Sequence, residues 1–149
     1  MSWVKKFDHN LIGRCRKLEM PMARAAIFII YFWFGALKLL GLSPATPLVL
    51  ALFEKTIGNL MSFGIFYTFF SVFEVAIGIL FLIHGLERAA IYLLGLHLFT
   101  TILPLFLLPN LTWQSFLVPT LEGQYIIKNV LIVALAAGIA ARLPAMHKH

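Results

Sequence analysis

Three ionisable side chains lie within long apolar stretches of this sequence: Lys38, Glu74 and Lys128. The stretch 60–84 around Glu74 is long enough to cross a bilayer as a helix, because about 20 residues at about 1.5 Å each span about 30 Å of hydrocarbon. An unpaired charge there costs about 2.5 to 3.5 kcal/mol on insertion scales. Glu74 must therefore be neutral, lie beside water or pair with another side chain.

The direction of the side chains predicts a partner for Glu74. Measured from the outer ends of their helices, Lys38 lies about 5 Å deep, Lys128 about 7 Å and Glu74 about 18 Å, at about 1.5 Å per residue. Helical side chains lean toward the amino end of their helix, so Lys38 leans inward and Glu74 leans outward. We expect the two charges to meet at a depth of about 10 to 15 Å, which offsets part of the cost of burial. Lys128 leans toward the outer surface.

Two interpretations of these residues remain open. In the structural one, the Lys38–Glu74 pair holds two helices together, and Lys128 extends its amine to the interface. In the functional one, the intramembrane ionisable groups mark a site that accepts a quinone head group, a small anion or a proton. That site is a small outward-opening pocket lined by Lys38, Glu74, Tyr67, Thr100, Thr101, His97 and Lys128.

The histidines and the cysteine restrict cofactor chemistry. His84 and His97 differ in expected depth by about 14 Å at about 1.5 Å per residue, which is too far for both to ligate one haem iron. His97 is expected to be a hydrogen-bonded core residue or, alternatively, a proton-relay partner. Cys15 is the only cysteine, and no HExxH motif or paired ligand spacing occurs. We expect no catalytic residue, no metal site and no cofactor held by the chain itself, with a quinone or a lipid as the candidate ligand.

Composition places these residues in a membrane protein. Of the 149 residues, 61% are hydrophobic and 12% are charged, whereas a soluble domain has about 25% charged residues. The sequence predicts an all-α integral membrane four-helix bundle over residues 21–149. Pro104 should bend the third helix near Thr100. The expected membrane spans are residues 22–42, 60–84, 89–108 and 124–143, with a candidate interfacial helix in the insert 47–59.

Residues 1–20 form a basic segment with an apolar face. Trp3, Phe7 and Leu11 recur every four residues and share one side of a helix. This spacing predicts a short interfacial helix on an anionic leaflet, and the alternative is a basic tail that only sets topology. Pro21 suits the first turn of a helix, so we expect the first membrane helix to begin there.

The distribution of basic residues predicts the orientation. They concentrate before the first span, at Arg88 in the hinge between the second and third spans, and after the fourth, whereas the opposite loops offer only Lys55. By the positive-inside rule both termini face the cytoplasm. The formal net charge of +6 is therefore a topology signal, and nucleic acid is not an expected partner.

Four short motifs resemble, in order, those of DoxX-like membrane proteins, and most closely the YkgB-like branch. They are FWFGALKL at 32–39, EVAIG at 74–78, TILP at 101–104 and GQYIIKNVL at 123–131. The resemblance covers about three quarters of the chain and implies a four-helix bundle of the bacterial inner membrane, with Lys38, Glu74 and Lys128 at motif positions. Asn129 differs from the acid that usually follows the last lysine. Members resemble small membrane subunits linked to quinone-coupled sulfur oxidation or to oxidative-stress resistance.

These observations lead to two functional hypotheses. The first is an accessory subunit, without catalysis of its own, of a larger respiratory or quinone-linked oxidoreductase complex, where it helps to shape a quinone or lipid site. The alternative is a small transporter or channel for a proton, an anion or a small redox-active molecule, which four helices would form only as an oligomer. A stand-alone quinone-reducing enzyme is disfavoured because the chain encodes no electron-carrying group. The expected partners are the lipid bilayer and either a larger membrane complex or further copies of the chain.

Overall fold

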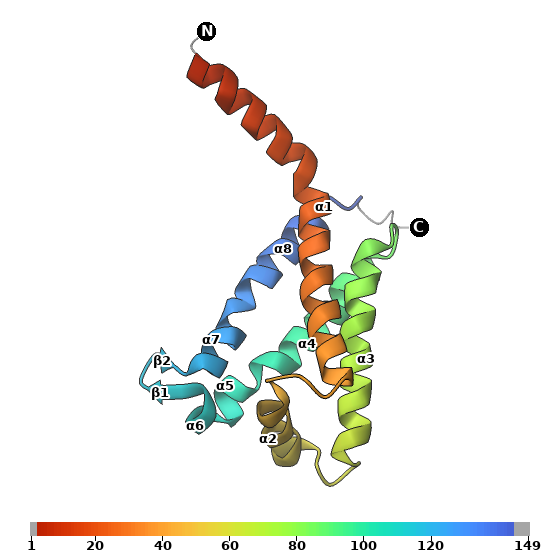
Figure 1. Ribbon diagram of the computed structural model, residues 1–149, viewed down its shortest axis with the longest axis vertical. Coiled ribbons are helices and arrows are strands. Elements are labelled where there is room, and N and C mark those ends of the chain that lie inside the picture. Colours follow the sequence, from red (N-terminus) through yellow and green to blue (C-terminus); the bar gives the residue numbers. More distant parts are fainter. Residues whose placement is uncertain (1–2, 145–149) are drawn as a thin grey trace.

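Within residues 3–144, which the computed structural model describes, four helical segments are long and apolar enough to cross a bilayer. They follow the four predicted apolar runs in order (Figure 1). The first two residues of the predicted amino-terminal segment (1–2) and the last five of the predicted bundle (145–149) lie outside the described part. The segments are α1 (Trp3–Leu39), α3 (Phe63–Leu82), α4 with α5 (Glu87–Ile102 and Pro104–Leu107), and α7 with α8 (Leu121–Lys128 and Val130–Ala141).

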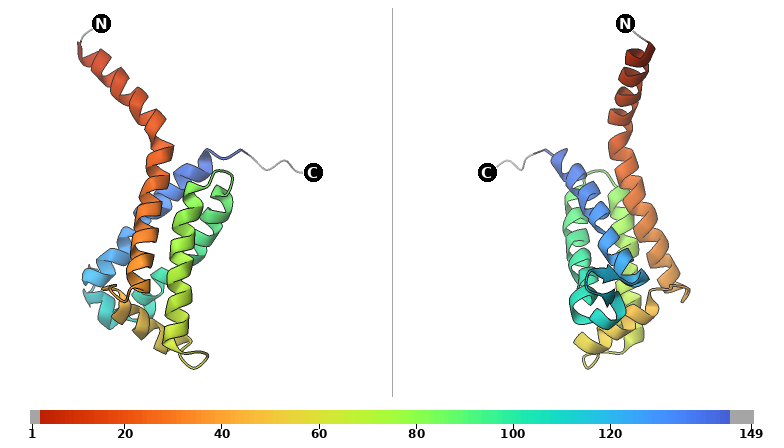
Figure 2. Two further views of the ribbon diagram at one scale, coloured as in Figure 1. Left: turned by 45° about the vertical axis from the view of Figure 1, so that its right-hand side comes forward. Right: turned by 90° about the vertical axis from the view of Figure 1, so that its left-hand side faces the viewer.

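Helix α1 differs from the prediction at its amino end. A separate short helix ending before Pro21 was expected, but one continuous helix runs from Trp3 to Leu39 with Pro21 inside it. Proline removes one backbone hydrogen bond and bends a helix without always ending it. Figure 1 shows this bend: the red amino-terminal part of α1 leans away from the bundle, and both views in Figure 2 show it extending beyond the other helices.

Helices α1 and α3 pack closely along their length because glycines allow their backbones to approach. A Cβ added at Gly78 would lie 2.9 Å from the backbone nitrogen of Phe32, and one added at Gly35 would lie 3.0 Å from the carbonyl oxygen of Ser71. Small residues at such crossings are typical of membrane helix pairs. The apolar core begins beside this contact and continues onto α4 and α8, with Ile27, Ile77, Phe81, Leu94 and Ile139 at its centre.

Two of the four segments are interrupted. Helix α4 ends at Ile102, and α5 starts at Pro104. The bend expected near Thr100 is thus a break at Leu103, about one turn later. Leu103 itself keeps helical backbone angles, but Pro104 has no backbone N–H with which to continue the hydrogen bonds of α4. The hydroxyls of Thr100 and Thr101 donate to the carbonyl oxygen of His97, at 2.7 and 2.9 Å. In the fourth segment, Asn129 separates α7 from α8.

The connecting segments carry structure of their own at the end of the bundle away from the amino terminus (Figure 2). Helix α2 (Thr46–Thr56) lies within the insert where a helix was expected. Residues 109–123 were expected to be a polar connection, but they contain helix α6 (Pro109–Thr112) and an antiparallel pair of strands, β1 (Trp113–Ser115) and β2 (Val118–Pro119). The described chain is mostly helical, which is consistent with the all-α prediction. The strand pair was not predicted, because strands this short carry no alternating pattern that a sequence reveals.

The close approach of α1 and α3 predicts a difference between two glycine substitutions. Gly78→Ala should destabilise the protein by about 1 to 3 kcal/mol, because the new methyl group would overlap the α1 backbone. Gly95→Ala is the matched control, since nothing lies within 4 Å of a Cβ there. Thermal unfolding in one detergent measures both. Equal midpoints for the two variants would contradict the close packing of α1 against α3.

Candidate functional site

Lys38 and Glu74 form a buried ion pair between α1 and α3. The Nζ atom of Lys38 lies 2.5 Å from Oε2 of Glu74, and the two residues are only 7% and 5% exposed. Lys38 lies in the last turn of α1, where the helix dipole favours a cation. The structure thus brings together the two charges whose side chains were expected to lean toward one another.

The second carboxylate oxygen of Glu74 connects the ion pair to α4 and back to α1. Oε1 lies 2.9 Å from Nε2 of His97, and Nδ1 of His97 lies 3.1 Å from the hydroxyl of Tyr31. An imidazole that accepts the Tyr31 proton at Nδ1 carries its own proton on Nε2 and donates it to Glu74. Lys38, Glu74, His97 and Tyr31, hereafter the Glu74 cluster, therefore form one hydrogen-bonded chain across three helices.

Aromatic side chains surround this chain and keep water away. The Phe70 ring stacks on His97 with centroids 5.1 Å apart, and Nζ of Lys38 lies 5.4 Å from the centre of the same ring. Tyr31 meets His97 edge to face at 5.1 Å. Because the surroundings are apolar, the attraction between the charges is stronger than in water, and removing either charge leaves its partner costly to bury.

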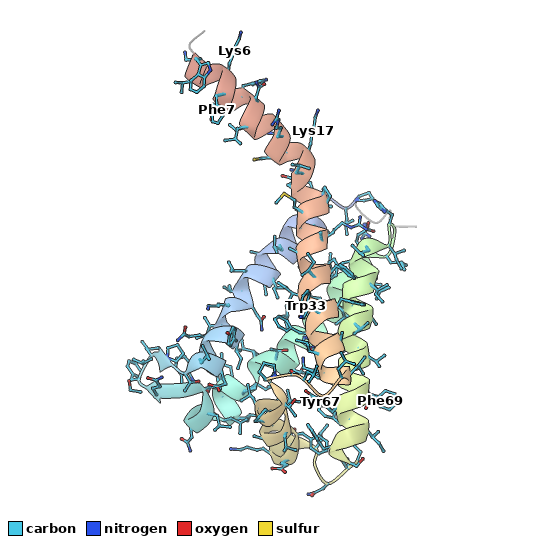
Figure 3. The ribbon with its side chains drawn as sticks, viewed as in Figure 1. Lys6, Phe7, Lys17, Trp33, Tyr67 and Phe69 are labelled. Carbon is cyan, nitrogen blue, oxygen red and sulfur yellow. The ribbon has the colours of Figure 1, made fainter. Side chains whose placement is uncertain are left out.

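Of three further expected site residues, one joins the cluster and two, both half-buried, bond elsewhere. Thr101 joins the cluster, with its hydroxyl 3.2 Å from Nδ1 of His97. Thr100 bonds only to the backbone of its own helix. Tyr67 lies nearer α2 (Figure 3), and its hydroxyl is 2.6 Å from Oγ1 of Thr46.

Lys128 does not reach the Glu74 cluster. It is exposed on α7, with Nζ 5.4 Å from the Tyr125 ring. The structure therefore brings Lys38, Glu74, His97 and Thr101 of the seven expected residues together, and their side chains contact one another directly. Two cavities in the described part of the chain lie elsewhere, one along the amino-terminal part of α1 and one beside Arg24.

A second buried polar cluster, which the sequence reasoning missed, lies at the opposite end of the bundle. Arg24 donates from Nε to the carbonyl oxygen of Phe81 at 2.6 Å and from Nη1 to Oε1 of Glu87 at 2.8 Å. The other oxygen of Glu87 accepts from the backbone N–H of Gly85 at 2.7 Å. The basic residues at the start of the first span, Arg24 among them, had been interpreted only as a topology signal. We call this end of the bundle the Arg24 end.

A seven-residue spacing along α1 could have identified Arg24 and Tyr31 as members of the same buried face as Lys38. Arg24, Tyr31 and Lys38 follow one another at intervals of seven residues and so share one face of the helix. Between Arg24 and Tyr31 the same face carries Ile27, which is fully buried. The face of α1 that contacts α3 and α4 thus carries Arg24 at one end and Tyr31 and Lys38 toward the other, with an apolar stretch at Ile27 between them.

The described residues offer few ligands for a metal. Among residues 3–144, no group of three or more His, Cys, Asp or Glu side chains lies close enough to hold one ion. Comparison with protein-family models, with curated proteins and with solved structures found no match. The two polar clusters and the surface around them are therefore the features that bear on function.

The ion pair predicts a strong effect on stability. Lys38→Met should destabilise the protein by about 3 to 5 kcal/mol, because it leaves the Glu74 charge without its cation. Combining Lys38→Met with Glu74→Gln should cost less than the sum of the two single variants.

The matched control is Lys128→Met, which removes an exposed lysine and should change stability by no more than about 0.5 kcal/mol. Chemical denaturation in mixed micelles measures all four variants. Additive single and double effects would show that Lys38 and Glu74 do not stabilise one another.

Proposed function

We propose that this protein is a small multi-pass membrane protein that exchanges protons through the Glu74 cluster, as an accessory subunit of a larger respiratory or quinone-linked membrane complex. The observation that carries the proposal is the buried chain of contacts that joins Lys38, Glu74, His97 and Tyr31. Ionisable groups inside a membrane span are rare and are typical of proton or substrate pathways.

The geometry favours a proton over a larger ligand. Each contact in the cluster, from the amine through the carboxylate and imidazole to the phenol, is 3.1 Å or shorter. A proton can move along such a chain by small shifts between hydrogen-bonded atoms, because the imidazole of His97 has one ring nitrogen facing the carboxylate and the other facing the phenol. A quinone head group needs a cavity, and neither of the two cavities described above lies at the cluster, whose side chains contact one another directly. We therefore propose that a quinone or a lipid binds at the interface with the partner subunit.

An apolar layer supports the role of a subunit rather than that of a lone channel. The cluster ends at Tyr31, and the core between Tyr31 and Arg24 is filled by Ile27, Ile77 and Phe81, all fully buried. A single copy thus offers no continuous polar chain between its two buried clusters. Proton exchange at one end serves a neighbouring redox site without a path across the whole bundle.

The surface of the bundle supports burial against lipid or protein. Large apolar side chains such as Trp33 and Phe69 point away from the other helices (Figure 3), and they are 63% and 72% exposed. A bilayer and a partner complex are the surroundings in which such a surface is stable. The ordered motifs that resemble DoxX-like proteins support the same role and a place in the bacterial inner membrane with both termini cytoplasmic.

The second candidate is a small transporter or channel. Its support is the same pair of charges, Lys38 and Glu74, buried in apolar spans. Because the apolar layer blocks a single copy, this function requires an oligomer in which neighbouring copies supply a pathway.

One substitution separates these two functions. Glu74→Gln keeps the size and the hydrogen-bonding shape of the side chain but removes its exchangeable charge. The protein, purified from its native membrane in mild detergent, should carry larger subunits in a fixed ratio, identified by mass spectrometry. In the variant, the ratio should stay the same while the redox turnover of the complex falls by about tenfold or more.

Glu54→Gln is the control, because it makes the same change at an exposed carboxylate and should leave turnover unaltered. A homo-oligomer that moves protons in liposomes, and loses that activity in Glu74→Gln, would establish the transporter instead. If Glu74→Gln changed only the yield of the complex, the cluster would be structural.

A further inference from the structure

The Arg24 end of the bundle contains a cavity that the proposed function does not use. It has a volume of about 230 Å³ and is lined by residues from α1, the last residue of α3 and the turn that follows α3, namely Met20, Pro21, Arg24, Leu82 and His84. One water molecule occupies about 30 Å³ of liquid. The cavity is therefore large enough for a group of several heavy atoms.

Arg24 presents one unused nitrogen in this region. Its Nε and Nη1 atoms are fixed by Phe81 and Glu87, whereas Nη2 is buried and has no hydrogen-bond partner within residues 3–144. The residue is only 8% exposed. A buried guanidinium nitrogen without an acceptor is unfavourable, so this position favours an additional acceptor. The two existing bonds hold the guanidinium in place before any ligand arrives.

The charges around the cavity favour an anion. Glu87 balances Arg24, but His84 lines the cavity and Arg88 lies in the adjacent turn, where it bonds to the carbonyl oxygen of Pro144. Arg142 pairs with Glu19, next to the cavity residue Met20. Lys17 lies seven residues before Arg24, on the same face of α1. The basic side chains at this end therefore outnumber the two carboxylates.

We propose that the cavity binds a phosphate group, with Nη2 of Arg24 and the imidazole of His84 as its donors. Arginine is well suited to phosphate oxygens because its nitrogens donate in a fixed planar arrangement. The remaining lining, Met20, Pro21 and Leu82, is apolar and matches the glycerol and acyl part of an anionic phospholipid. The cavity also lies at the end of apolar spans, the level at which lipid headgroups occur.

The test compares lipids that differ only in their headgroup. Delipidated protein in detergent is titrated with phosphatidylglycerol or phosphatidylcholine of identical acyl chains, and bound lipid is counted by native mass spectrometry. Phosphatidylglycerol should bind about tenfold more tightly. His84→Ala and Arg24→Lys should each remove most of this preference, and because His84 is exposed, its variant keeps the measurement interpretable if Arg24→Lys fails to fold.

Lys6→Gln is the control, because it removes one positive charge from an exposed part of α1 that is remote in sequence from the cavity. A preference that falls equally in Lys6→Gln and His84→Ala would reflect general surface charge and would overturn the proposal. Equal binding of the two lipids, with no stabilisation by inorganic phosphate at about 10 mM, would also overturn it. Stabilisation by inorganic phosphate alone, lost in His84→Ala, would assign the site to a free phosphate rather than to a lipid.

Discussion

The buried carboxylate of Glu74 is the constraint on which the rest of the bundle depends. A charge removed from water needs partners at hydrogen-bond distance, and Glu74 obtains one from α1 and one from α4. Lys38 reaches it because α1 and α3 lie close together at Gly35 and Gly78, one turn from each member of the pair. The glycines thus allow α1 and α3 to approach closely, and the paired charges stabilise that same contact.

The bundle separates its polar groups into two levels. The Glu74 cluster and the Arg24–Glu87 pair occupy opposite ends of one interface, and fully buried apolar side chains, such as Ile27 and Ile77, lie between them. Each level pairs its own charges, so neither depends on the other for charge balance. This arrangement suits a protein that exchanges protons at one end and binds an anionic group at the other.

The ion pair and the outward lean of Lys128 were predictable from the sequence, whereas the choice between a pocket with Lys128 and one without it was not. The depth of Lys38 and Glu74 and the lean of their side chains follow from helix geometry alone, which is the same in every helix. Whether a residue faces the bundle or the lipid depends instead on the rotation of its helix about its own axis. Lys128 is an ionisable residue in an apolar span, as Lys38 and Glu74 are, but the rotation of α7 places it on the outside beside Tyr125.

By itself, the sequence determined the number and order of the apolar spans, the break before Pro104 and the need for a partner to Glu74, because hydropathy, proline geometry and the cost of a buried charge act locally. Only the tertiary structure decided that His97 and Tyr31 extend the ion pair and that Arg24 meets Glu87. It also decided that α1 continues through Pro21 and that a strand pair forms after α6. These features depend on which helix faces meet, and that choice is made by the packing of all the helices together.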